Sequence, residues 1–297
     1  MSAEAAAAPD SPAMDTPYKP LEPNSARFAG KYCLVTGASK GIGKATALRL
    51  AQEGAHVALH YGRDKAGAED CAAQIAAWNR EHSGVEEPRT LLLQADMGSE
   101  EAITKMFADY FAHWPRLDVC IPNAGTQTGC DSHEVEMASF DRIIDINLKG
   151  YFLCARQALK HFVEREGGPR GGVIVFDSSV HQVVPKPTYV SYACTKAAIG
   201  HMTATLALEY AERGVRVNCV GPGAIDTPMN AAWTGDASKR KGVCEHIPMG
   251  RPGYADEIAA TFAFLASDEA AYITGQTLFA CGGLTLYPEF RSAWSSE

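Results

Sequence analysis

The 297-residue sequence predicts an α/β fold, in which a doubly wound, Rossmann-type parallel sheet of about seven strands carries helices on both faces. Three observations lead to this fold class. Short apolar runs alternate with longer helical segments along the chain. The runs lack polar alternation, as expected for strands buried on both faces. A glycine-rich turn follows the first run directly. The sequence shows neither repeats nor an internal linker, so a single domain is expected.

The expected strands are Val-, Leu- and Ile-rich runs, at 32–36, 56–61, 90–95, 117–122, 172–178, 215–220 and 277–283. Helices are expected between them, at 41–54, 64–80, 99–113, 137–165 and 190–213. Right-handed crossovers between these elements give the doubly wound arrangement. Residues 226–249 show no strong period, and we interpret them as a mobile lid over a substrate. A surface insertion unrelated to the substrate is the alternative.

Composition narrows the class of protein. The formal net charge of −8 argues against nucleic-acid and membrane partners, and no apolar run is long enough to span a bilayer. The nine cysteines are scattered without a C-x-x-C pair or a Cys/His cluster, so we expect reduced, mostly buried thiols and no metal site. Residues 1–27, rich in Ala, Pro and Ser, predict a flexible tail before a domain at 28–297. We expect a cytoplasmic location.

The segment TGASKGIG, at 36–43, joins the first expected strand to the first expected helix. Gly37 permits the sharp turn out of the strand, Gly41 lets the backbone approach a pyrophosphate, and Gly43 allows close packing of helix on strand. The helix N-terminus then faces the phosphates. A glycine-rich turn without a ligand is the alternative, but the position between strand and helix favours dinucleotide binding.

Tyr192 and Lys196 lie four residues apart in an expected helix, so they share one face. A free tyrosine is a poor base at neutral pH, because its pKa is about 10. A nearby ammonium group and an oxidised nicotinamide both favour the phenolate, which allows acid and base catalysis. Tyr189 has Ala193 four residues later, and we expect it to be a packing or pocket-wall residue.

Six motifs occur in a fixed order along the chain: TGASKGIG (36–43), NAG (123–125), INLKG (146–150), SSV (178–180), YACTK (192–196) and GPG (221–223). In these motifs the chain resembles the short-chain dehydrogenase/reductase family, in its single-domain branch, over roughly residues 28–288. The resemblance implies an NAD(P)-dependent enzyme that transfers a hydride between CH–OH and C=O groups. It also suggests a homotetramer with a small-molecule substrate.

The resemblance implies four catalytic residues. Tyr192 is the general acid/base, and Lys196 supports it and binds the nicotinamide ribose. The family's serine precedes the tyrosine by about 13 residues, which selects Ser179, with Ser178 as the fallback. Asn147 matches an asparagine that supports a water-linked proton path to the lysine; a helix-bend residue without chemistry is the alternative, and the two roles can coexist.

The cofactor site favours NADP(H), with NAD(H) possible. An acidic residue that binds the ribose diol is expected at the end of the second strand of an NAD site. Here His60 and Tyr61 occupy that position, and Lys40 and Arg63 could pair with a 2′-phosphate. The alternative is that Lys40 and Arg63 are solvated surface charges. Asp64 lies nearby in the sequence and could weaken their attraction to a 2′-phosphate.

Asp96 matches the family's adenine-contacting aspartate, and a helix N-cap is its alternative. The full set implied for the cofactor is Gly37, Ser39, Lys40, Gly41, Ile42, Gly43, Tyr61, Arg63, Asp96, Met97, Asn123, Ala124, Gly125, Tyr192, Lys196, Pro222, Gly223, Ile225 and Thr227. Asn123 is expected to stabilise the sheet beside the cofactor.

Within the family, the chain is most similar to bacterial glucose 1-dehydrogenases. The resemblance implies that Ser179, His181, Gln127 and Asn230 contact the substrate. The sequence departs from that pattern at Gln127, at Lys186, where an aromatic residue is expected, and at Cys281. A sugar or polyol alcohol is therefore the expected substrate class, with a ketone of secondary metabolism or a carrier-tethered 3-oxoacyl chain as alternatives.

A basic patch near the pocket mouth would favour the carrier-tethered chain, and SKRKG at 238–242 is the candidate, with a solvated charge run as its alternative. A nucleotide-sensing scaffold is the non-enzymatic alternative, but such relatives tend to lose the tyrosine or the lysine, and both are present here.

Overall fold

The computed structural model describes residues 22–23, 26–82, 90–165 and 171–286. Its main sheet has seven parallel strands in the order β3-β2-β1-β4-β5-β6-β9, which confirms the predicted fold class. The strands are β1 (Tyr32–Val35), β2 (His56–Tyr61), β3 (Thr90–Gln94), β4 (Val119–Ile121), β5 (Gly172–Asp177), β6 (Val215–Pro222) and β9 (Thr277–Ala280). The strand order reverses between β1 and β4, and a crevice is expected at the carboxyl ends of strands at such a switch point.

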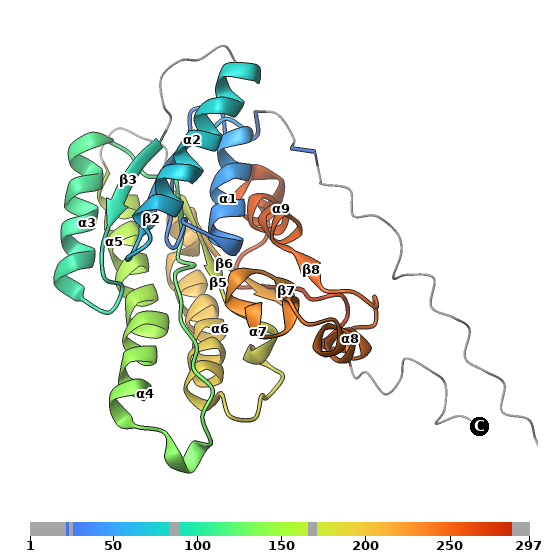
Figure 1. The fold of residues 1–297 in the computed structure, drawn as a ribbon. Coiled ribbons are helices and arrows are strands. Elements are labelled where there is room, and N and C mark those ends of the chain that lie inside the picture. Colours follow the sequence, from blue (N-terminus) through green and yellow to red (C-terminus); the bar gives the residue numbers. More distant parts are fainter. Residues whose placement is uncertain (1–21, 24–25, 83–89, 166–170, 287–297) are drawn as a thin grey trace, which may run out of the picture.

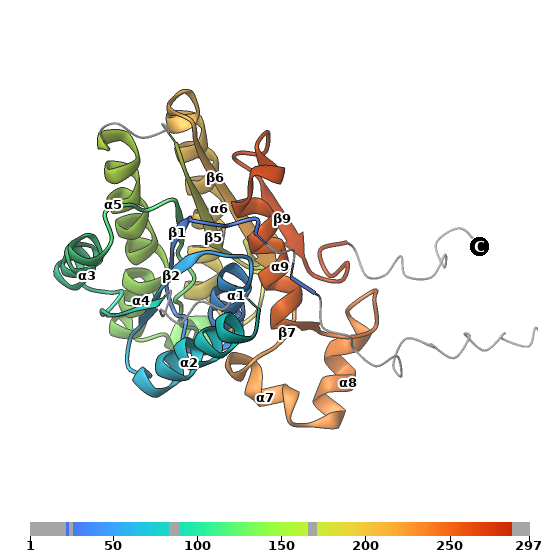
Figure 2. The same cartoon turned by 90° about the horizontal axis from the view of Figure 1, so that it is seen from above.

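Two layers of helices enclose the sheet (Figures 1 and 2). One layer holds α1 (Gly41–Gln52), α2 (Lys65–His82) and α9 (Ala255–Ala266), and the other holds α3 (Glu100–His113), α5 (Gly150–Glu164) and α6 (Val190–Tyr210). Each layer packs on its own apolar core. In β1, for example, Leu34 belongs to the core under α3 and α5, while Cys33 and Val35 belong to the core under α1 and α9. Burial on both faces explains why the strands lack polar alternation.

The helix expected over 137–165 is present but interrupted. It consists of α4 (Met137–Ile144), a π-helical turn at Asp145–Lys149, and α5. Periodicity did not reveal the wide turn, because its backbone remains close to helical. Such π turns inside α-helices are frequent at functional sites, and this one contains Asn147.

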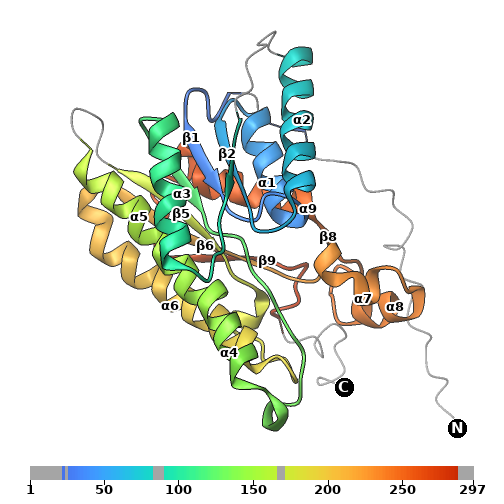
Figure 3. The ribbon, with the colours of Figure 1, turned by 60° about the vertical axis from the view of Figure 1, so that its left-hand side comes forward.

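The segment 226–249 contains more regular structure than the sequence predicted. It includes α7 (Ala231–Thr234) and α8 (Ala237–Glu245), which lie beyond the sheet next to the pair β7 (Ile225–Asp226) and β8 (Gly253–Tyr254) (Figure 3). The side chain of Asp236 begins α8 by accepting hydrogen bonds from the backbone N–H groups of Ser238 and Lys239. The helix has almost no apolar stripe, which is why its period escaped detection.

Helix α9 was not predicted either, although it covers much of α1. Its sequence is apolar on most sides, with Ile258, Phe262 and Leu265 buried, so an amphipathic pattern is weak. Short 3₁₀ turns complete the fold, at Ser132–Glu134, Val180–Gln182, Ala211–Arg213, Pro228–Asn230 and Asp268–Ala270.

The predicted tail at 1–27 lies almost wholly outside the described residues, so its flexibility stays a prediction. Arg27, at its end, is held by the fold, because its Nε lies 2.6 Å from Glu53 Oε2. All nine cysteines belong to the described part, and all are free thiols. Six of them are buried, which confirms the expectation that most of the thiols are buried.

Candidate active site

A cavity of about 1070 Å³ opens at the carboxyl ends of the strands. It collects most of the residues that the sequence assigned to cofactor and substrate: Gly37, Ser39, Lys40, Gly41, Ile42, Gly43, Arg63, Asp96, Met97, Asn123, Ala124, Gly125, Gln127, Ser179, His181, Tyr192, Pro222, Gly223, Ile225, Thr227 and Asn230. Three of the predicted residues do not line it. Tyr61 ends β2 outside the cavity wall, whereas Asn147 and Lys196 are buried behind the wall.

The glycine loop has the geometry that a dinucleotide requires. Gly37 has φ +71°, and a Cβ there would lie 2.9 Å from Ala124 Cα. A Cβ on Gly43 would overlap the carbonyl oxygen of Gly37. Gly41 also has a positive φ, of +57°, and only Thr227 lies near the space that its Cβ would fill. The loop therefore leaves bare backbone facing the cavity, which fits a pyrophosphate.

His60 fixes this loop to the second strand. Its ring is 1% exposed; Nδ1 accepts a hydrogen bond from Gly37 N–H at 3.1 Å, and Nε2 lies 3.1 Å from the carbonyl oxygen of Ala95. Since a carbonyl only accepts, Nε2 carries the proton and the ring is neutral. Burial lowers the pKa of His60 to about 4. The sequence placed His60 beside the ribose; the structure adds a positioning role.

Two carboxylates at the adenine end already have partners. Asp64 Oδ1 accepts from Gly67 N–H at 3.0 Å, in the first turn of α2. Asp96 Oδ1 lies 2.8 Å from Arg142 Nη2, and this hydrogen bond lowers the pKa of Asp96. The N-cap alternative for Asp96 is wrong, because the helix that follows is capped by Ser99, whose hydroxyl accepts from Ala102 N–H.

Tyr192 and Lys196 lie on α6, with side chains buried to different depths. Tyr192 borders the cavity, whereas Lys196 lies behind it and is only 2% exposed. The Lys196 ammonium donates to the backbone carbonyl of Asp177 at 2.7 Å and lies 5.5 Å from the centroid of the Tyr192 ring. The pair therefore places a buried ammonium one helical turn from the Tyr192 phenol ring.

Asp177 is a residue that sequence reasoning missed. It ends β5, and its Oδ2 lies 3.7 Å from Lys196 Nζ. Burial raises the pKa of Asp177 to about 6, an effect that the lysine opposes. Tyr151, Cys219 and Lys196 surround it. The sequence does contain a feature that points to Asp177: it is a carboxylate at the end of an apolar strand, directly before the serine pair.

The two serines that follow differ in their surroundings. The Ser178 hydroxyl donates to the carbonyl of Lys196 at 3.0 Å and so holds β5 to α6. The Ser179 hydroxyl accepts from His181 N–H at 3.1 Å, which leaves its own proton available to a molecule in the cavity. This arrangement favours Ser179 over Ser178 as the residue that contacts the reacting oxygen.

Asn147 uses both ends of its amide to hold the segment after β4. Its Oδ1 accepts from Thr126 N–H at 2.9 Å, and its Nδ2 donates to Thr126 O at 2.8 Å. The same Nδ2 lies 3.4 Å from Thr195 Oγ1 on α6. Asn123 acts similarly, donating from Nδ2 to the carbonyl of Thr36 at 2.8 Å. Both asparagines therefore position the backbone around the cavity.

The substrate end of the cavity carries His181, Lys186 and Asn230. His181 Nδ1 lies 2.9 Å from the carbonyl of Val184, so Nδ1 carries the proton and Nε2 remains an acceptor. Burial lowers the pKa of His181, which keeps the ring neutral at neutral pH. The Lys186 ammonium lies 3.7 Å from the ring centroid of Tyr189. Tyr189 itself does not line the cavity, in agreement with a packing role.

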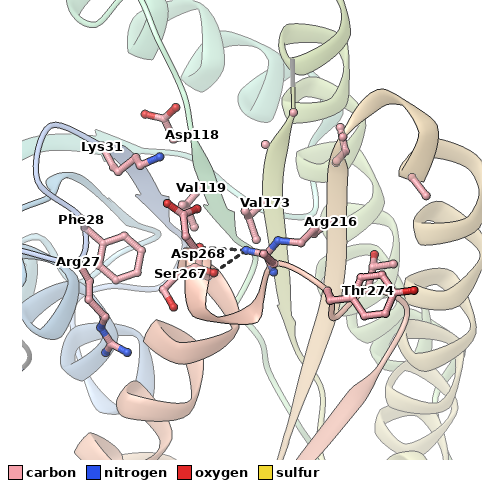
Figure 4. Close-up of a pocket in the computed structure, with 18 of the residues that line it drawn as sticks. Arg27, Phe28, Lys31, Asp118, Val119, Val173, Arg216, Ser267, Asp268 and Thr274 are labelled. Carbon is pink, nitrogen blue, oxygen red and sulfur yellow. Dashed lines mark hydrogen bonds between the residues drawn. The ribbon is translucent and has the colours of Figure 1, made fainter. Parts of the chain in front are cut away.

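A second cavity, of about 670 Å³, lies at the opposite end of the sheet, where the strands begin (Figure 4). It is rich in arginines, but these have partners within the fold. Arg216 donates to the carbonyls of Leu265 and Ser267, at 2.7 and 2.8 Å, at the end of α9. Arg116 Nε lies 2.7 Å from Asp118 Oδ1. These contacts give the arginines a structural role.

Within the described residues, no three His, Cys, Asp or Glu side chains lie close enough together to hold a metal ion. In the same part of the chain, no helix is both long and apolar enough to cross a membrane.

A Rossmann-type sheet, a glycine loop and a buried Tyr–Lys pair at one cavity define a dinucleotide-dependent oxidoreductase. Comparison with known proteins gives the family. A family model described as enoyl-(acyl carrier protein) reductase matches residues 37–285. The glucose 1-dehydrogenase of Gluconobacter oxydans (strain 621H) is 44% identical over 283 residues, which cover 95% of this chain and all of the relative.

Solved structures agree. The 3-ketoacyl-(acyl-carrier-protein) reductase from Brucella melitensis, complexed with NADH, matches with a TM-score of 0.78 and 32% identity, over 87% of this chain and 99% of that one. The angucycline C-6 ketoreductase LanV, with bound NADP, matches with a TM-score of 0.78 and 29% identity, over 90% and 100%. The chain belongs to the short-chain dehydrogenase/reductase family and is an NAD(P)-dependent oxidoreductase acting on CH–OH and C=O groups.

Proposed function

We propose that this protein is an NADP(H)-dependent oxidoreductase that interconverts a secondary alcohol of a sugar or polyol and the corresponding carbonyl, with Tyr192 as general acid/base. One observation carries the proposal. Tyr192 lies one helical turn from the buried Lys196 and shares a cavity with Ser179 and the glycine loop.

The residues divide the proton chemistry among them. In the reductive direction the Tyr192 hydroxyl gives its proton to the carbonyl oxygen, and in the oxidative direction the phenolate takes a proton from the alcohol. Lys196 stabilises that phenolate, and the Ser179 hydroxyl donates to the substrate oxygen. Asn147 holds the backbone of Thr126 and also lies 3.4 Å from the Thr195 hydroxyl, next to Lys196 in the chain, which supports a place on the proton path. The nicotinamide, when bound, supplies or accepts the hydride.

Preference for NADP(H) is supported by Lys40 and Arg63, which line the adenine end of the cavity. Asp64 is the acid most able to offset their charge, and its carboxylate accepts a hydrogen bond from Gly67 N–H in the first turn of α2. A 2′-phosphate would pair with both cations, whereas NAD(H) would leave them unused. Pro222, Gly223, Ile225 and Thr227 would then hold the nicotinamide end.

A hydroxyl-rich substrate is supported by neutral polar groups at the other end. His181 offers an acceptor, and the Gln127 amide also lines the wall. Asn230 donates to the carbonyl of Ile225 at 2.8 Å, which leaves its amide oxygen as an acceptor. Similarity to a glucose 1-dehydrogenase agrees with this substrate class.

Reduction of a ketone of secondary metabolism is the second candidate, favoured by the similarity to an angucycline ketoreductase. The carrier-tethered alternative is weaker. Its expected docking patch lies on α8, where Arg240 pairs with Asp226 at 2.7 Å and Lys239 lies 3.9 Å from Asp236. Two of the three cations of the patch are paired in this way, which weakens the attraction that the patch offers to an acidic carrier.

A homotetramer remains part of the proposal. Large apolar side chains stand exposed on two neighbouring elements, Phe152 (44%) on α5 and Leu208 (84%) on α6, which suits burial against another copy. A cytoplasmic location agrees with nine free thiols.

The test is a spectrophotometric screen of sugars, polyols and ketones with NADP(H) and NAD(H) in parallel. We expect turnover of at least one polyol, with a higher kcat/KM for NADP(H). Cofactor binding without turnover of any compound in the screen would contradict the proposed function.

A further inference from the structure

We infer that the substrate carries a carboxylate and that Lys186 binds it at the substrate end of the cavity. The inference rests on the proposed function and narrows its substrate class, from polyols in general to polyhydroxy acids and their keto forms. Two observations support it: the backbone of Lys186 is held in place by its neighbours, and the carboxylates around the cavity already have other partners.

Lys186 sits in a stiff segment between the fifth strand and α6. Pro185 and Pro187 flank it, and a residue that precedes a proline is confined to extended conformations. Thr188 follows with a φ of +66°, which is unusual for a β-branched residue. Its carbonyl accepts from Cys130 N–H at 2.8 Å, so the segment is tied to the chain that carries Gln127. The backbone of Lys186 is therefore held in place before a ligand arrives.

The carboxylates that line the cavity are all engaged elsewhere. Asp96 pairs with Arg142, Asp177 lies against Lys196, and Asp64 accepts from the first turn of α2. Among the described residues, none of these nor any other acid forms an ion pair with Lys186. Its ammonium is partly buried, and this burial lowers the pKa of Lys186. A partly desolvated cation without a counter-ion is poised to bind an anion.

The cofactor does not need this cation. Its phosphates are expected at the glycine loop and its 2′-phosphate beside Lys40 and Arg63, at the other end of the cavity. Lys186 instead neighbours His181, whose pKa its charge helps to lower. The ring of Tyr189, 3.7 Å from the ammonium, stabilises the charge but does not neutralise it. A purely structural cation–π contact is the competing explanation, and the test below separates the two.

The carboxylate takes no part in the chemistry. At one secondary alcohol of the acid, the O–H proton would go to the Tyr192 phenolate and the hydride of the C–H bond would go to the nicotinamide of bound NADP⁺, which leaves a ketone at that carbon. The carboxylate stays ionised and bound to Lys186, which orients the chain so that one hydroxyl faces Ser179. Recognition at one end and oxidation at another would give regioselectivity on an otherwise repetitive molecule.

The experiment compares D-gluconate with D-sorbitol, which share a six-carbon polyol chain and differ in one carboxylate. We expect kcat/KM for gluconate to exceed that for sorbitol by about tenfold or more with NADP⁺, the scale of a charge-assisted hydrogen bond. Lys186→Met should abolish this preference, mainly through KM for gluconate, and leave KM for NADP⁺ unchanged. Lys186→Arg should retain it. Thermal unfolding of each variant checks that the fold is intact.

The outcomes separate the two proposals. Turnover of sorbitol or glucose without a gain for gluconate overturns the carboxylate inference and leaves the proposed function standing. A gluconate preference that survives in Lys186→Met also overturns it, and leaves Lys186 with the cation–π contact alone. If the screen finds no polyol or polyhydroxy acid that is turned over, both proposals fail.

Discussion

The two ends of the sheet each carry a large cavity with charged walls, yet they differ in how those charges are used. At the amino ends of the strands, Arg27, Arg116, Arg165 and Arg216 all hold backbone carbonyls or carboxylates. At the carboxyl ends, Arg142 pairs with Asp96, but Lys40, Arg63 and Lys186 form no ion pair within the described part of the chain. The volume of a cavity and its positive charge are therefore poor guides to function. Charged side chains that have no partner within the fold are the better guide to a ligand site.

The difference follows from the parallel sheet. Its carboxyl ends open into loops and helix N-termini, which present N–H groups and free side chains to a ligand. At its amino ends, the carbonyls that terminate helices such as α9 need donors, and arginines supply them. One end is built to bind a ligand and the other to close the fold.

The largest effect is expected from Tyr192→Phe, which removes the proton donor and keeps the ring. Because general acid–base catalysis contributes about 10²- to 10⁴-fold, kcat should fall by at least about 100-fold while the Kd for the cofactor changes little. Steady-state kinetics and cofactor titration measure the two quantities. Tyr189→Phe is the matched control and should keep wild-type turnover. Wild-type kcat in Tyr192→Phe would remove the acid/base role.

The next effect is a pair of opposite pH dependences at the carboxyl end. The pKa of His60 falls to about 4 in the fold from an ordinary value of 6.5. Below pH 6.5 the His60 side chain becomes protonated in the unfolded chain but stays neutral in the folded one. The free energy of unfolding therefore decreases as the pH falls toward 4, by up to about 3 kcal/mol. The pKa of Asp177 rises to about 6 from 3.8, so its contribution is favourable at pH 4 and lost as the pH rises through 6.

Denaturant unfolding between pH 4 and pH 7 tests both signs. In His60→Gln the acid-induced loss of stability should be smaller than in the wild type. In Asp177→Asn it should be larger, because the compensating gain is gone. Identical slopes in the wild type and both variants would show that neither group is perturbed in this way.

Arg216→Leu tests the amino end. It removes the donor to three carbonyls at the end of α9, those of Leu265, Ala266 and Ser267, so the free energy of unfolding should fall by about 2 kcal/mol. The value of kcat/KM at 25 °C should stay within about twofold of the wild type, because the cavity at the carboxyl end is untouched. Chemical denaturation and steady-state kinetics give the two readouts. A loss of activity without a loss of stability would mean that the arginine-rich cavity binds a ligand.

Much of the fold could be predicted, because local patterns specify it. Buried strands and amphipathic helices leave periodic signals. The seven predicted strands were wrong only at their ends, whereas the short strands β7 and β8 were not predicted. The first strand ends at Val35, shortly before Gly37, whose φ of +71° turns the backbone out of the strand. The last ends at Ala280, before Gly282 and Gly283 at positive φ. Helices α8 and α9 were missed because one is nearly all polar and the other nearly all apolar.

The residues of the candidate site also fall into two groups, those that a local sequence pattern predicts and those that only the folded chain reveals. The glycine loop, the serine pair and the Tyr192–Lys196 spacing are local patterns, and the structure brings them to one cavity. Asp177 and His60 depend on partners far along the chain: Lys196 is 19 residues from Asp177, and Ala95 is 35 residues from His60. No window of sequence contains both members of such a pair, so only the folded chain reveals them.

The smallest effect concerns the two cations expected to select the cofactor. Replacing Lys40 or Arg63 with alanine should raise KM for NADP⁺ about tenfold, because each removes one charge-assisted contact to the 2′-phosphate, and KM for NAD⁺ should stay unchanged. Lys44→Ala is the matched control, since Lys44 follows the same loop but pairs with Asp70. Steady-state kinetics with both cofactors measure the ratio. If the variants weaken NAD⁺ and NADP⁺ equally, these side chains act as general phosphate attraction, and the carboxyl end selects its cofactor by other means.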